Sequence, residues 1–178
     1  MLFVSAAQVN IQVPWELAGQ TEALLTAGFG GLASAGQNVN LAPFAPGIFA
    51  INGRGYGQGA ILDASYRLVD ATNPTTPGAV VQIYCTGLGA VTNQPATGAP
   101  APNDPLAMTI TLPRVVIGNA PAKVQFSGLA PGYAGLYQVN AEVPAEAARG
   151  VAVSVTILVG EVVSNTVTIA IAIPIGRF

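Results

Sequence analysis

The side chains that most often carry catalysis are scarce in this sequence. Its 178 residues include no His and a single Cys, Cys85. Cys85 ends the apolar run at residues 80–85, where we expect a buried, inert thiol because no imidazole can activate it. Mechanisms that need a Ser–His or Cys–His pair are therefore excluded, as are His-based zinc and haem sites.

The remaining polar residues do not form a convincing site either. Glu142 and Glu146 are close in sequence, but Glu142 falls on the polar face of an expected strand and Glu146 in a turn. We therefore expect both to be solvated surface residues and not a catalytic pair. The glycine-rich residues 53–59 fail as a phosphate loop because a strand, not a helix, is expected to follow them. Oxygen ligands for calcium could come from Asp63, Asp70, Asn73 and Asp104, although their spacing matches no calcium loop. We therefore expect no enzyme and no cofactor.

Composition favours many short strands separated by turns. Charged residues make up only 8% of the chain and apolar residues 51%, with 21 Gly and 14 Pro. The six basic residues are scattered, so nucleic-acid binding is not expected. The most apolar stretch, residues 162–175, is interrupted by Ser, Asn, Thr and Pro, so no transmembrane segment is expected. Few charges also leave a surface that tolerates self-association.

Alternation of apolar and polar residues predicts an antiparallel β-protein with almost no helix. A helical turn is possible at residues 15–18, and residues 87–105 form a long polar loop. Tyr137 is expected in the core or at a strand corner. Trp15 and the tyrosines at 56, 66, 84, 133 and 137 could form a carbohydrate-stacking platform if exposed. Strands are expected at residues 8–13, 22–27, 60–63, 66–70, 79–86, 108–112, 114–117, 122–126, 135–143, 151–159 and 162–173.

An internal repeat organises the chain. Residues 8–14 read QVNIQVP and residues 138–144 read QVNAEVP, an offset of 130. The same offset relates Gly30 to Gly160 and Ser34 to Ser164. Residues 2–42 align without gaps to residues 132–172, which are only the last third of the unit at 43–173. The N-terminal region therefore repeats the final strands of a domain without the strands that should precede them.

Seven segments of the chain match a known family, and they are residues 8–17, 41–49, 57–62, 81–89, 126–132, 135–140 and 164–169. Through these segments the chain resembles the Ig-like domain at the C-terminal ends of large exported proteins of Acidobacteria, of the Solibacter type. This resemblance implies export and an Ig-like β-sandwich, and it brings no catalytic residues.

We therefore expect an antiparallel Ig-like β-sandwich at residues 43–178, preceded by a partial Ig-like domain at residues 1–42. A three-stranded sheet with one apolar face cannot close a sandwich alone. That face could be covered by the complete domain, by a missing part of a longer chain, or by another subunit. For the last case we expect an assembly interface formed by Val9, Ile11, Val13 and Trp15.

The function expected from these features is a non-catalytic structural module, secreted or held at the cell surface. It would form homo-oligomers or filaments by strand or sheet complementation between subunits. The alternative is an accessory module that binds a surface glycan or a protein partner.

Overall fold

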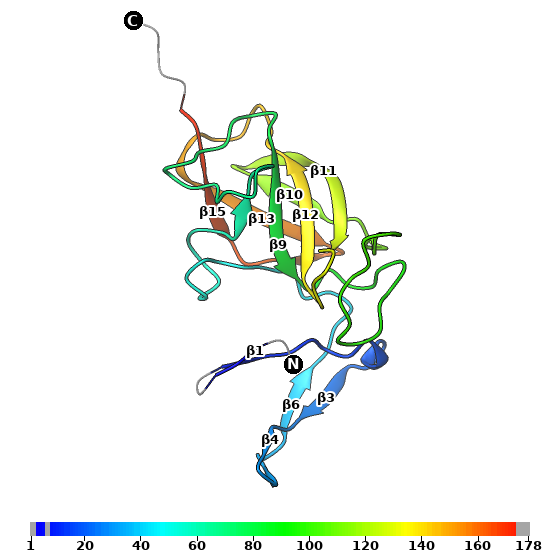
Figure 1. The fold of residues 1–178 in the computed structure, drawn as a ribbon. Helices are drawn as coiled ribbons and strands as arrows, with labels where there is room; N and C mark the ends of the chain where they lie inside the picture. The colour runs from blue at the N-terminus through cyan, green and yellow to red at the C-terminus, as the bar shows by residue number, and fades with distance from the viewer. Residues whose placement is uncertain (1–2, 6–7, 174–178) are drawn as a thin grey trace, which may run out of the picture.

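The computed structural model describes residues 3–5 and 8–173. The outer limits expected for the two domains, residues 1 and 178, lie outside the described residues. The described part of the protein consists of an N-terminal arm at residues 3–42 and a β-domain at residues 43–173 (Figure 1). No helix in the described residues has the length and apolar character needed to cross a membrane.

The β-domain is one antiparallel sheet of nine strands. Its strand order is β14-β13-β10-β11-β12-β9-β7, while β15 also pairs with β13 and β8 with β9. The strands are β7 (Gly47–Ile48), β8 (Ile61–Leu62), β9 (Val80–Thr86), β10 (Arg114–Ile117), β11 (Ala120–Leu129), β12 (Tyr137–Glu142), β13 (Gly150–Val159), β14 (Val162–Val163) and β15 (Val167–Ile171).

This sheet curls, so that β9, β12 and β11 lie opposite β13 and β15 (Figure 1). In β12 and β13, alternate residues point into the space between the two halves, as the twofold period of a strand requires. Along β13, the buried positions are Val153, Val155, Ile157 and Val159. Along β12 they are Tyr137, Val139 and Ala141. The two sets meet in one apolar cluster.

Side-chain hydrogen bonds close the ends of the curled sheet. The hydroxyl of Tyr137 donates to the carbonyl of Gly89, in the loop that follows β9, and the ring is buried in the core, one of the two places expected for it. Asn165 accepts from the Ile48 N–H at 2.7 Å and donates to the Ile48 carbonyl at 2.9 Å. The start of the domain is thereby fastened to the turn that precedes β15.

The prediction of a strand at residues 108–112 is wrong. Only isolated bridges form there, from Thr109 to Val91 and from Met108 to Gly128. The segment runs briefly along the same edge of β11 that β10 occupies farther on, where Val115 pairs with Ala122. Ile110 and Leu112 are exposed because the chain leaves this edge before β10 begins. Strand β10 itself has the predicted bounds.

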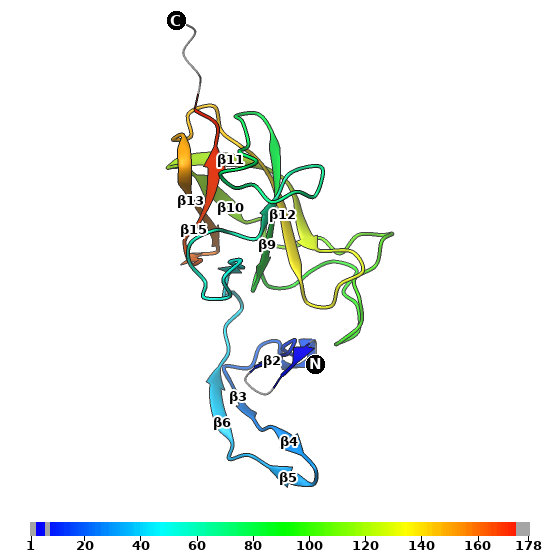
Figure 2. The ribbon, with the colours of Figure 1, turned by 60° about the vertical axis from the view of Figure 1, so that its left-hand side comes forward.

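The arm consists of two hairpins joined by a short helical turn. Strands β1 (Phe3–Val4) and β2 (Val9–Asn10) pair with each other, and a 3-10 turn (Trp15–Leu17) follows. The second hairpin is formed by β3 (Glu22–Leu25) with β6 (Gln37–Asn40), and by β4 (Gly28–Phe29) with β5 (Leu32–Ala33) at its tip. Figure 2 shows this hairpin extending away from the β-domain.

Candidate functional site

The four residues predicted to form an assembly interface separate into two groups. Val9, Ile11 and Val13 are 52%, 48% and 55% exposed, although they share the apolar pattern of the buried Val139, Ala141 and Val143. Trp15 instead packs, partly buried, against the core of the β-domain. The first three remain available for a partner, whereas Trp15 attaches the arm to its own domain.

This attachment uses the long polar loop predicted at residues 87–105. The Trp15 N–H donates to the Thr97 hydroxyl at 3.0 Å, and that hydroxyl donates to the Glu16 carboxylate at 2.7 Å. The bond from Thr97 holds the pKa of Glu16 below its usual value. The Gly98 N–H donates to the Gln12 side chain at 2.8 Å. Residues 12–16 thus anchor the arm, and the hairpin beyond them is left outside the β-domain.

The second hairpin of the arm, formed by β3, β4, β5 and β6, is called the arm hairpin below. It has the same strand register as the hairpin formed by β13, β14 and β15. Five of the six residue pairs of this hairpin recur 130 positions later, and the sixth, Glu22–Asn40, does not, because the register of β13 shifts at the corresponding place. The recurring pairs are Ala23–Val39, Leu24–Asn38, Leu25–Gln37, Gly28–Ala33 and Phe29–Leu32 in the arm, and Val153–Ile169, Ser154–Thr168, Val155–Val167, Leu158–Val163 and Val159–Val162 in the β-domain. Gly30 and Gly160, in the two turns, share a φ of +58°.

Side-chain hydrogen bonds recur at the same offset. The Gln8 amide donates to Asn10 at 2.6 Å, and the Gln138 amide donates to Asn140 at 2.8 Å. A serine hydroxyl bridges each hairpin in the same way, Ser34 in the arm and Ser164 in the β-domain. The two hairpins therefore agree in most of their backbone pairs, and the two segments also agree in these polar contacts.

They differ in what covers them. Phe29 is 93% exposed, whereas Val159, its counterpart, is 0% exposed. Leu25 and Val39 are also exposed, while their counterparts Val155 and Ile169 are fully buried. We define these side chains, Leu25, Phe29 and Val39, as the arm face. Sequence reasoning missed them, although the same gap-free alignment assigns all three to core positions.

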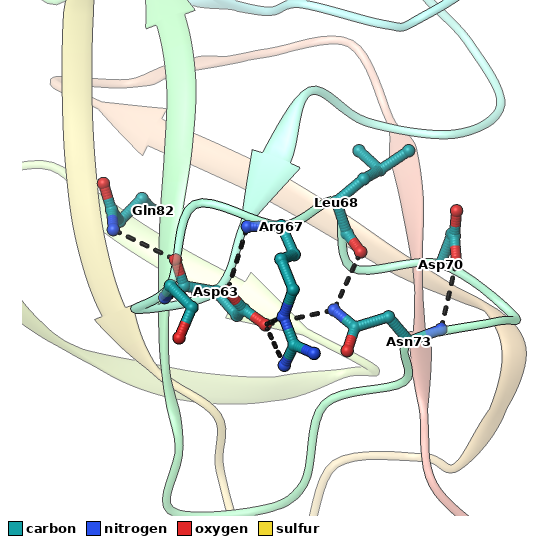
Figure 3. Close-up of polar contacts among 7 residues, drawn as sticks. Asp63, Arg67, Leu68, Asp70, Asn73 and Gln82 are labelled. Atoms are coloured by element: carbon teal, nitrogen blue, oxygen red, sulfur yellow. Dashed lines mark hydrogen bonds and ion pairs between the residues drawn. The ribbon is translucent and has the colours of Figure 1, made fainter.

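The acidic residues considered as calcium ligands do come together in part (Figure 3). The Asp63 carboxylate accepts hydrogen bonds from the Arg67 side chain at 2.8 and 3.0 Å and from the Asn73 amide at 3.1 Å. The Arg67 N–H and the Asn73 amide are the main causes that lower the pKa of Asp63 to about 2. A carboxylate that already faces a guanidinium makes a loop-bracing contact, so these residues do not form a cation site.

Asp70 lies in the same loop and caps its own turn. Its carboxylate accepts from the Thr72 hydroxyl at 2.7 Å, which lowers the pKa of Asp70. No group of three or more Cys, Asp and Glu side chains capable of holding a metal ion occurs in the described part of the chain. Cys85 is fully buried, and burial raises the pKa of its thiol.

Three tyrosines line a groove on the β-domain. Tyr66 and Tyr133 are exposed, Tyr84 is partly buried, and burial raises the pKa of Tyr84. The groove has a volume of about 550 Å³, and Gln138 lies at its wall. Tyr66 has a φ of +60°, a backbone conformation that is unfavourable for a bulky residue. These tyrosines are part of the set considered for carbohydrate stacking, whereas Tyr137 is buried.

Comparisons with family models, with curated proteins and with solved structures find no match to this chain.

Proposed function

We propose that this chain is a non-catalytic structural module of an exported protein, secreted or held at the cell surface. In this proposal residues 43–178 form a complete Ig-like β-sandwich and residues 1–42 are the last strands of a second one. The antiparallel sheet, curled around one apolar core, supports a sandwich arrangement. The register shared by the two hairpins supports the partial copy.

The exposed arm face is the observation on which the proposal depends. A two-stranded hairpin is marginally stable in water, and apolar side chains at core-equivalent positions favour burial. The loop contacts of residues 12–16 leave the arm face outside the β-domain. The face is completed by another subunit, and repetition of this contact from one subunit to the next builds an oligomer or a filament.

Light scattering over a range of concentrations, combined with electron microscopy of the concentrated protein, tests this function. We expect association that increases with concentration and extended particles at high concentration. A stable, well-folded monomer at every concentration would falsify assembly.

Two leucines of the arm provide a matched pair of variants. Leu25 is on the arm face, and its neighbour Leu24 points to the opposite side of the hairpin and is also exposed. Burial of a leucine side chain contributes about 1.5–3 kcal/mol. Leu25→Asn should therefore weaken association by about tenfold or more, and Leu24→Asn should weaken it less. Equal effects of the two variants would show that the arm face is not the contact.

The tyrosine groove favours a second candidate, an accessory module that binds carbohydrate. Aromatic side chains stack on sugar rings, and the side-chain oxygen of Gln138 can accept from sugar hydroxyls, because its amide nitrogen already donates to Gln82 and Asn140. Retention on immobilised polysaccharides tests this candidate. Tyr66→Ala and Tyr133→Ala should abolish retention, whereas Tyr56→Ala, at an exposed tyrosine outside the groove, should not. Dispersed particles with retention would favour this candidate over assembly.

A further inference from the structure

The free edge of the arm hairpin has a counterpart that is occupied. In the β-domain, the edge of β13 opposite β15 is paired with β10. The pairs are Arg114–Leu158, Val115–Ile157, Val116–Thr156 and Ile117–Val155. Subtracting 130 from the β13 positions gives residues 28, 27, 26 and 25 of the arm. Strand β3 is in a sheet of two strands, so among the described residues no strand pairs with this edge.

The pattern of β10 shows what a strand must have to fill the edge. Val115 and Ile117 are buried, and the two residues that alternate with them, Arg114 and Val116, are exposed. Ile117 lies opposite the buried Val155, whose counterpart is Leu25. A strand with this alternation, paired in the same register, would place its apolar residues on the arm face.

Hydrogen bonds show which backbone groups of the edge are available. Gly118 donates to the Ser154 carbonyl, so the even-numbered residues of β13 bond toward β10. The Ile157 N–H points the other way, to the Ser164 hydroxyl. The arm repeats this arrangement, because the Ala27 N–H donates to the Ser34 hydroxyl. Thr26 and Gly28 are therefore the residues that bond toward an added strand.

We propose that the edge formed by residues 25–28 is a docking site for one antiparallel strand of another polypeptide, with the apolar–polar alternation of β10. The edge carries no charged side chain, so main-chain hydrogen bonds supply the pairing and alternate apolar side chains supply the selectivity. This inference rests on the proposed assembly function and names the chemistry of the partner.

Register-specific disulfide trapping tests the docking site. The probe is a synthetic peptide with the sequence of residues 112–119 that carries a cysteine in place of either Val115 or Ile117. The intact chain carries Ala27→Cys or Leu25→Cys, with Cys85→Ala to remove the native thiol. In the β-domain these pairs lie between ladder hydrogen bonds, where Cα atoms are about 4.5 Å apart and suit a disulfide.

The expected result, in a glutathione redox buffer, is a crossed preference. The peptide with its cysteine at position 115 should trap the Ala27→Cys chain over the Leu25→Cys chain by about tenfold, because a shift of two residues separates the Cα atoms by about 7 Å. The peptide with its cysteine at position 117 should show the reverse preference. Trapping without preference, or no trapping above the level of a scrambled peptide, overturns the proposal. Predominant arm-to-arm dimers also overturn it, because they identify a second arm as the occupant.

Hydrogen exchange of the unsubstituted chain gives an independent readout. With the unmodified peptide in excess, the amides of Thr26 and Gly28 should exchange at least about tenfold more slowly, and that of Ala27 should not change. Exchange that is unaffected at Thr26 and Gly28 contradicts the docking site. If the chain assembles in light scattering but fails both tests, the proposed function stands and this inference falls.

Discussion

Ser34 and Ser164 lie 130 positions apart and make the same three hydrogen bonds. The N–H of each serine donates at 2.8 Å to a carbonyl seven residues earlier, that of Ala27 or Ile157. The hydroxyl accepts from the N–H of that same residue, at 3.0 Å for Ser34 and 2.9 Å for Ser164. It also donates to the next carbonyl along the chain, at 2.9 and 2.7 Å. Ser164 is buried and Ser34 is exposed, so one local structure occurs in two environments.

This contrast gives the first prediction. Ser164→Ala leaves the Ile157 N–H inside the domain without its acceptor, and this should lower the free energy of unfolding by about 1–3 kcal/mol. Ser34→Ala should have almost no effect on the dispersed protein, because water replaces the hydroxyl. Urea denaturation of both variants measures the difference. Equal losses would mean that the arm face is already covered in the dispersed protein.

The hydrogen bond between Tyr137 and Gly89 can be tested by removal of one oxygen. Tyr137→Phe keeps the ring in the core but removes the hydrogen bond to the Gly89 carbonyl. We expect a loss of about 1–2 kcal/mol in the free energy of unfolding. Tyr56→Phe, at an exposed tyrosine, is the matched control and should change the stability by less than about 0.5 kcal/mol. A Tyr137→Phe protein as stable as the control would show that the hydrogen bond to Gly89 contributes nothing to the free energy of unfolding.

Gly87 lies against the first residues of the β-domain, and its carbonyl accepts from the Ala45 N–H at 2.9 Å. A Cβ at this position would lie 1.8 Å from the Ala45 carbonyl oxygen, and φ is +73°. Gly87→Ala should therefore displace residues 45–46 and lower the melting temperature. Gly78→Ala is the control, because φ is +82° there but no atom lies within 4 Å. Gly78→Ala should lower the free energy of unfolding by about 1–2 kcal/mol through backbone strain alone. Gly87→Ala should lower it by clearly more. Equal costs would contradict the steric argument.

Stability should fall in acid partly through Asp63. Its pKa is lowered from 3.8 to about 2 by hydrogen bonds from Arg67 and Asn73. A carboxyl group with a lowered pKa in the folded protein contributes stability that is complete above its unfolded pKa and is lost as the pH falls through the folded value. Asp63→Asn should therefore be less stable than the native chain at pH 6, and this difference should shrink between about pH 4 and pH 2. Denaturation curves at several pH values measure it, and a constant difference would contradict this role.

Much of the fold was predictable because the relevant signals are local. The alternation in residues 114–117 and 151–159 predicts strands that face a core on one side, and the structure confirms them. The segment at 108–112 has the same alternation but forms only bridges, because the chain leaves the edge of β11 after Thr109 and returns to it only at β10. Whether a segment stays on a strand edge depends on contacts with residues distant in sequence, and no local pattern reports it.

The candidate site was likewise predictable only in part. The sequence determined that residues 2–42 repeat the end of the unit at 43–173, and that Val9, Ile11 and Val13 share one face, because both statements follow from residue order alone. Only the tertiary structure decided that Trp15 joins the core of the β-domain while Leu25 and Phe29 remain exposed. Alternation shows which side chains lie on one side of a strand, but the segment that covers that side is set by contacts between distant parts of the chain or between chains.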